Sequence, residues 1–63
     1  MSVRILLEKV HGGFVATASH DGCEIAHATA VSGDLAVRRA KAKVIDLSEE
    51  DVEFDVIDMN GGE

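Results

Sequence analysis

The stretch VRILLEKVHGGFVATA, residues 3–18, decides the fold of this chain. From Val3 to Leu7 apolar side chains recur with a period of two, as in a half-buried β-strand. The glycine pair Gly12-Gly13 follows, and glycines supply the positive φ angles that a tight turn needs. Residues 14–18 (FVATA) then fit the partner strand. This stretch therefore predicts a β-hairpin.

Beyond the hairpin the sequence predicts a third strand and a helix. The tripeptide His20-Asp21-Gly22 has the composition of a turn, and a third strand covers residues 23–28. Ser32-Gly33-Asp34 is typical of a helix start, because serine caps free N–H groups and an acid suits the positive first turn. Apolar residues then recur at helical spacing and predict the buried face of the helix. They are Ala36, Val37, Ala40, Val44 and Leu47.

The last segment fits two structures. Residues 48–51 (SEED) have the composition of a helix N-terminus, with a serine followed by acids. In contrast, Val52, Phe54 and Val56 alternate with their neighbours as they would in a strand. We favour a turn through 48–51 and a fourth strand over 52–58, and a helix over 48–58 is the alternative.

The predicted fold class is α+β, with element order β-β-β-α-β. We expect one small domain over residues 1–63, in which one helix packs on one face of an antiparallel sheet. The 63 residues include 29 apolar ones, eight of them alanine, so the core is small and a pocket for a large cofactor is not expected. The expected core includes Ile5, Phe14, Val44 and Phe54, and residues 60–63 are expected to form a flexible tail.

Charge is segregated along the chain. Residues 1–45 contain four acids and all six bases, for a net charge of +2, whereas residues 46–63 contain eight acids and no base, for −8. The total of −6 argues against direct binding of nucleic acid or of an anionic membrane, since both attract cationic surfaces. An acidic surface instead attracts basic proteins, many of which handle nucleic acid.

The cysteine content and the hydropathy predict a cytoplasmic protein. Cys23 is the one cysteine of the chain, so no internal disulfide forms and a reducing compartment is the simpler interpretation. No apolar run approaches the roughly 18 residues of a membrane span. Exposed sheet edges are compatible with a monomer or a weak homodimer.

The acids near the carboxyl end are the candidate partner-binding residues. In a strand over 52–58, the side chains of Glu53 and Asp55 project from one face about 7 Å apart, a spacing comparable to that of phosphates along a DNA strand. A row of this kind predicts a protein that occupies a groove built for nucleic acid. The plainer interpretation is a solvated face, or acids paired with Arg38, Arg39, Lys41 and Lys43. The candidate residues are Glu49, Glu50, Asp51, Glu53, Asp55 and Asp58.

Two catalytic alternatives rest on residues 20–27. His20, Cys23 and His27 have a His-x2-Cys-x3-His spacing, with His11 as a conceivable fourth zinc ligand. In this interpretation Cys23 and His27 share one strand face. Cys23 beside a histidine would also be a candidate thiol nucleophile. Surface histidines and an inert thiol are the more common interpretation. We therefore expect no metal, no cofactor and no enzymatic activity.

Four short motifs resemble the HicB-like antitoxin domain over about residues 3–47. They are Ile5-Leu6-Leu7-Glu8-Lys9, Gly12-Gly13-Phe14-Val15-Ala16, Asp21-Gly22-Cys23 and the alanine-rich helix around Ala36 and Ala40. This resemblance implies a related fold. It also implies a domain that binds and blocks a small, basic, RNA-cleaving toxin.

By type, the chain also resembles phage anti-CRISPR proteins. It is small, acidic, poor in cysteine and without an enzyme signature. Such proteins inhibit CRISPR effectors by occupying DNA-binding surfaces, and some act as DNA mimics. The resemblance implies a non-enzymatic inhibitor in the host cytoplasm, with a Cascade-type surveillance complex as its target. The ribonuclease toxin is the alternative partner, and a metal- or thiol-dependent enzyme is the third possibility.

Overall fold

Two tight hairpins join the first three strands in the computed structural model of the chain, which describes residues 1–48 and 51–59. Strand β1 spans Ser2–Val10, β2 spans Gly13–His20 and β3 spans Cys23–Ala30. β2 pairs antiparallel with β1, and β3 pairs antiparallel with β2. The predicted hairpin is confirmed, although only one glycine of the first turn, Gly12, has a positive φ, of 87°, while Gly13 already belongs to β2.

The second hairpin joins β2 and β3 through a turn whose backbone twist matches the right-handed twist of the two strands. Its two central residues, Asp21 and Gly22, both have positive φ angles, of 54° and 81°. This is the type I′ pattern, for which Asp-Gly is a preferred sequence because both residues tolerate the left-handed region. The predicted turn at 20–22 is therefore confirmed, and β3 extends two residues beyond the predicted end.

Helix α1 spans Gly33–Leu47. Its N-cap is Ser32, whose side-chain oxygen accepts a hydrogen bond from the backbone N–H of Leu35 at 3.2 Å. At the other end the backbone N–H of Ser48 donates to the carbonyl of Val44 at 3.0 Å. The predicted helix start is therefore confirmed, and the cap satisfies one of the N–H groups that a helix start leaves free.

The fourth strand, β4, spans Glu53–Asp58 and pairs in parallel with β1. The helix alternative for 48–58 is therefore wrong where the structure describes the segment. The sheet has the order β3-β2-β1-β4 and is mixed, not antiparallel throughout as predicted. The parallel pairing arises because α1 connects β3 to β4 across the sheet, and a crossover of this kind lets β4 run in the same direction as β1.

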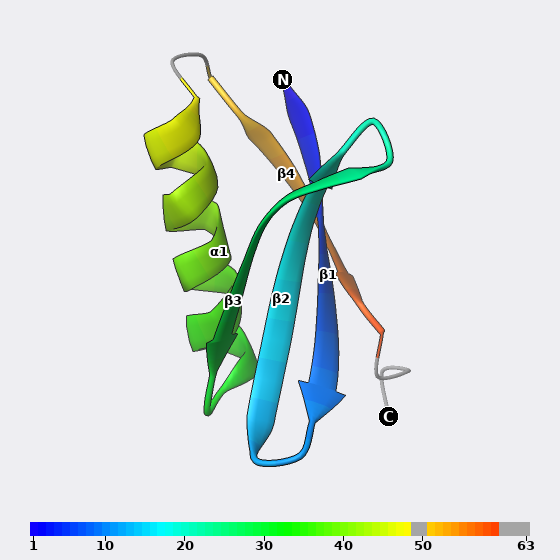
Figure 1. Cartoon of the computed structure of the whole chain (residues 1–63), viewed down its shortest axis with the longest axis vertical. Helices are drawn as coiled ribbons and strands as arrows, with labels where there is room; N and C mark the ends of the chain where they lie inside the picture. Colours follow the sequence, from blue (N-terminus) through cyan, green and yellow to red (C-terminus); the bar gives the residue numbers. More distant parts are fainter. Residues whose placement is uncertain (49–50, 60–63) are drawn as a thin grey trace.

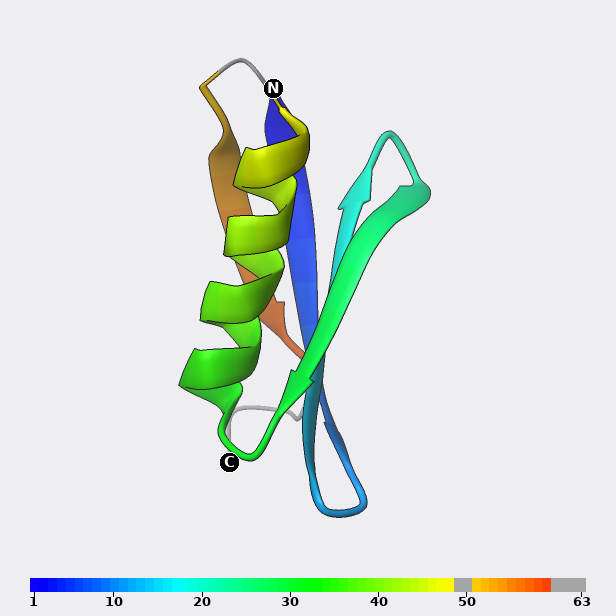
Figure 2. The same cartoon turned by 60° about the vertical axis from the view of Figure 1, so that its left-hand side comes forward.

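The helix covers one face of the sheet and buries the core against it (Figure 1, Figure 2). It packs mainly on β2 and β3 and less on β1. Five of the eight buried core residues are alanines, which allow α1 to lie close to the sheet. The buried residues are Val3, Ile5, Ala16, Ala18, Ala28, Ala36, Ala40 and Val44. The predicted α+β class, with three strands, a helix and a last strand, is confirmed.

Some predicted core positions are more exposed than expected. Phe14 and Phe54 are only partly buried at the border of the core, as is Val37 on the helix. Leu47 was expected on the buried face, but it is 70% exposed because the last turn of α1 extends past the core. Among the described residues, no helix has the length and apolar character needed to cross a membrane.

Candidate interaction surface

The side chains of β4 that lie on one face of the sheet differ from those that lie on the other. Val3 and Ile5 of β1 are buried beneath α1, and their parallel partners in β4 are Phe54 and Val56. Residues of β4 with even numbers therefore lie on the helix side, and those with odd numbers lie on the opposite side, because strand side chains alternate. We call that opposite side the open face.

The candidate acids divide between these faces. Glu53 and Asp55 are exposed and lie side by side on the open face, as the strand prediction required. Asp58 is also exposed, but it is the register partner of Leu7 and lies on the helix side. Asp51 is exposed just before β4, and its backbone carbonyl accepts a hydrogen bond from the amino terminus at 3.2 Å. Glu49 and Glu50 lie outside the described residues.

Lysine and arginine side chains of the described chain do not form ion pairs with Asp51, Glu53 or Asp55. The two ion pairs that join one described residue to another both involve histidines of β2 and β3, as His20–Asp21 at 3.4 Å and His27–Glu24 at 3.2 Å. The internal pairing of these three acids with helix bases, considered from the sequence, is therefore absent where the structure describes it. Their negative charge remains directed to solvent.

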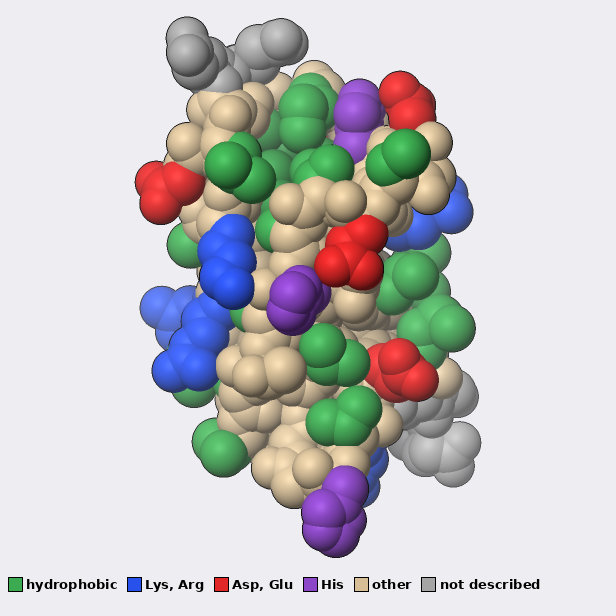
Figure 3. All heavy atoms as spheres, in the orientation of Figure 1, with side chains coloured by type: hydrophobic (Ala, Val, Ile, Leu, Met, Phe, Trp, Pro, Cys, Tyr) green, Lys and Arg blue, Asp and Glu red, His purple; other side chains and the backbone are tan. Residues whose placement is uncertain are grey.

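The helix bases instead bind backbone and aromatic groups. Arg39 donates a hydrogen bond through Nη1 to the carbonyl of Thr29 at 3.0 Å, and Lys43 donates through Nζ to the carbonyl of His27 at 2.6 Å. Lys41 places its Nζ 5.4 Å from the centre of the Phe54 ring, within the range of a cation–π contact. In Figure 3, Lys and Arg side chains gather along α1, while the acids visible on the same face are separated from one another.

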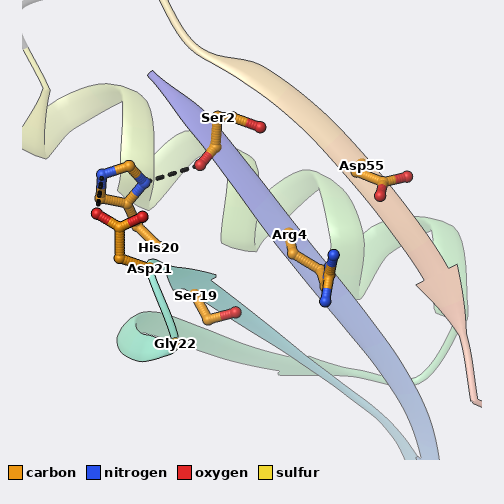
Figure 4. A pocket seen from close by; sticks show the side chains of 7 residues that line it. All are labelled: Ser2, Arg4, Ser19, His20, Asp21, Gly22 and Asp55. Carbon is orange, nitrogen blue, oxygen red and sulfur yellow. Dashed lines mark hydrogen bonds and ion pairs between the residues drawn. The ribbon is translucent and has the colours of Figure 1, made fainter.

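A shallow hollow adjoins Asp55 on the open face, between the start of β1 and the second hairpin (Figure 4). Arg4 and Asp55 are register partners and both line it, together with Ser2, Ser19, His20, Asp21 and Gly22. The ring of His20 donates from Nδ1 to the carbonyl of Ser2 at 2.8 Å. Sequence reasoning missed this hollow, because the pairing of β1 with β4 brings Arg4 to Asp55 across 51 positions of the chain.

The candidate metal residues do not converge. No group of three or more histidine, cysteine or acidic side chains suited to a metal ion is found among residues 1–48 and 51–59. The prediction that Cys23 and His27 share one face is wrong, because a β-bulge at Ile25 leaves that residue without a partner in β2. The extra residue reverses the alternation, so Glu24 shares the face of His27 and the exposed Cys23 lies on the other.

Comparison with models of protein families, with curated proteins and with solved structures finds no match to this chain.

Proposed function

We propose that this chain is a non-enzymatic inhibitor that binds a basic, nucleic-acid-handling protein through its acidic carboxyl-terminal third. The observation that carries the proposal is the acidic composition of residues 46–63, together with the exposed positions of three of its acids. This segment has eight acids and no base. Its members Asp51, Glu53 and Asp55 are exposed and form no ion pair with a described lysine or arginine. Their charge is therefore available to a partner.

The mechanism follows from the spacing of these carboxylates on a strand. Glu53 and Asp55 project from the open face about 7 Å apart, which is comparable to the separation of phosphates along DNA. They would engage the lysines and arginines that normally contact DNA, so that the protein and DNA compete for one surface. Complementary charge accelerates such an encounter and makes it sensitive to salt. The specific form of the proposal is an anti-CRISPR protein that acts on a Cascade-type complex in the host cytoplasm.

Charge reversal on β4 tests the proposal. The double variant Glu53→Lys/Asp55→Lys changes the net charge by +4, from −6 to −2. We expect the wild type to displace target DNA from a purified Cascade-type complex in a gel-shift titration. The double variant should need at least a tenfold higher concentration, because its lysines repel the DNA-binding surface.

A matched control separates position from net charge. Glu8→Lys/Glu24→Lys produces the same change of +4 at exposed positions of β1 and β3. This control should inhibit far better than the β4 double variant. Equal loss in both double variants would show that net charge alone matters, and no displacement by the wild type would refute the anti-CRISPR form of the proposal.

An antitoxin is the second candidate, and the positions of the resembling motifs favour it. Ile5-Leu6-Leu7-Glu8-Lys9 lies within β1, and Gly12-Gly13-Phe14-Val15-Ala16 covers the first turn and the start of β2. Asp21-Gly22-Cys23 covers the second turn. Inhibition of RNA cleavage by a small, basic, RNA-cleaving toxin, with no effect on DNA binding by a Cascade-type complex, would favour this candidate over the first.

A further inference from the structure

The two edges of the sheet differ in whether side chains bind their outward backbone groups. At the β3 edge, Arg39 and Lys43 bind the carbonyls of Thr29 and His27, which lie two residues apart and so point the same way. These bonds occupy the hydrogen-bonding groups to which another strand would pair. Covering an edge with charged side chains is a known protection against strand addition.

The β4 edge lacks this protection in the described part of the chain. The N–H groups of Glu53 and Met59 donate to the carbonyls of Met1 and Leu7, at 2.9 and 2.8 Å, so the odd-numbered residues of β4 turn their backbone toward β1. Phe54 and Val56 therefore point their N–H and C=O outward. No described residue bonds these outward groups.

Side chains beside this edge define what an added strand must present. On the open face it would lie next to Glu53 and Asp55, which favour positive charge in the opposing positions. On the helix side it would lie next to Phe54 and Val56, the latter 43% exposed, which favour apolar contact. Lys41 already stands over the Phe54 ring and disfavours a second cation on that side.

A second copy of this chain does not meet these requirements. If two β4 strands paired antiparallel with Val56 opposite Val56, Phe54 would lie opposite Asp58, an apolar ring against a carboxylate. Pairing with Phe54 opposite Val56, or with Phe54 opposite Phe54, would set Asp55 opposite Asp55, or Glu53 opposite Asp55, on the open face. Directly opposed like charges destabilise a strand pair. The complementary occupant is instead an extended segment that alternates basic and apolar residues.

We propose that β4 binds its partner by strand addition, accepting an extended segment in which basic and apolar residues alternate. This inference rests on the proposed function, since it specifies how the basic partner is recognised. The basic side chains lie over Glu53 and Asp55, and the apolar side chains cover Phe54 and Val56. Main-chain hydrogen bonds to Phe54 and Val56 supply affinity, and the alternation supplies specificity.

Two isomeric peptides test strand addition separately from charge. One is a peptide of about seven residues with alternating lysine and valine, and the other contains the same residues in two blocks. We expect the alternating peptide to bind the wild type about tenfold more tightly than the block isomer in calorimetric titrations. Amide exchange at Phe54 and Val56 should slow when it binds, because their N–H groups gain acceptors.

Variants at Val56 identify the edge. Val56→Pro removes an outward N–H without removing a bond to β1, and proline is tolerated at such edge positions. We expect this variant to bind both peptides equally weakly, whereas Val56→Thr, which keeps the N–H and the branched side chain, retains the tenfold preference. Circular dichroism and thermal melting monitor the fold of both variants.

The outcomes also separate this inference from the proposed function. Equal binding of the two peptides to the wild type, or unchanged exchange at Phe54 and Val56 in the complex, would overturn strand addition. The displacement of DNA from the Cascade-type complex is measured without these peptides, and it would still decide the inhibitor proposal. If Val56→Pro fails to fold, the exchange measurement on the wild type decides strand addition alone.

Discussion

Gly13 occupies a position where the first hairpin has no room for a side chain. A Cβ atom built there would lie 2.5 Å from the carbonyl oxygen of Ala30, which belongs to the backbone of β3. Gly12, its neighbour, has no atom within 4 Å of such a Cβ, but its φ is +87°. The two glycines are thus required for different reasons, one steric and one conformational.

We expect Gly13→Ala to reduce the free energy of unfolding by about 1–3 kcal/mol, the range for overpacking a tight site. The backbone of Ala30 must shift, since a carbonyl cannot rotate away as a flexible side chain can. Urea unfolding followed by circular dichroism measures the loss. Gly12→Asn is the control, because asparagine tolerates positive φ and open space surrounds it, so it should cost less than half as much. Equal losses would contradict the steric argument.

The bulge at Ile25 shows where residue-level prediction from sequence ends. The sequence predicted a strand over residues 23–28 after the turn, but no feature of the sequence indicated that one of its residues is unpaired in the sheet. Because the period of a strand is two, a single inserted residue moves every side chain beyond it to the other face. The predicted grouping of Cys23 with His27 failed for this reason, whereas Glu24 and His27 meet at 3.2 Å.

At the scale of elements, α1 both covers the core and protects an edge. Its alanines pack on the sheet, while Arg39 and Lys43 extend past the sheet border to the carbonyls of Thr29 and His27. Arg38, next to Arg39, is exposed and makes no hydrogen bond or ion pair among the described residues. The helix therefore offers a matched pair of positions, one that binds the edge and one that does not.

Removing the two edge-binding cations should expose β3. We expect Arg39→Met/Lys43→Met to lower the free energy of unfolding by about 1–3 kcal/mol, from two hydrogen bonds of roughly 0.5–1.5 kcal/mol each. It should also promote self-association, because the free carbonyls can pair with another strand. Sedimentation velocity over a range of protein concentrations measures the association. Arg38→Met is the control, and association equal to that of the double variant would argue against edge protection.

The order of the elements was predictable, but the partner of the last strand was not. The apolar alternation of Val52, Phe54 and Val56 favoured a strand over the helix alternative, and the structure places β4 there. Its parallel pairing with β1 depends on the path of the chain along α1, which the local pattern does not contain. The same limit applies to the candidate site, since the face shared by Glu53 and Asp55 follows from alternation, whereas the proximity of Arg4 follows from pairing.

At the scale of the whole molecule, the surplus of negative charge is concentrated near the carboxyl end of the sequence. Residues 46–63 contribute −8 to a net charge of −6. Within the described residues, ion pairs are confined to histidines of β2 and β3. A surplus of like charge destabilises a compact state through self-repulsion, and salt screens that repulsion.

The Tm should therefore rise with salt. If surface ion pairs between fully charged groups stabilised the fold, salt would screen their attraction and the Tm would fall instead. We expect the Tm of the wild type to increase between about 0.02 and 0.5 M sodium chloride, over which the Debye length shortens from more than 20 Å to about 4 Å. Glu53→Lys/Asp55→Lys, with a net charge of −2, should show a smaller increase, because it has less repulsion to screen. Differential scanning calorimetry at several salt concentrations measures both. A Tm that falls with salt in the wild type would mean that its acids are compensated within the molecule, and they would then have no surplus charge to offer a basic partner.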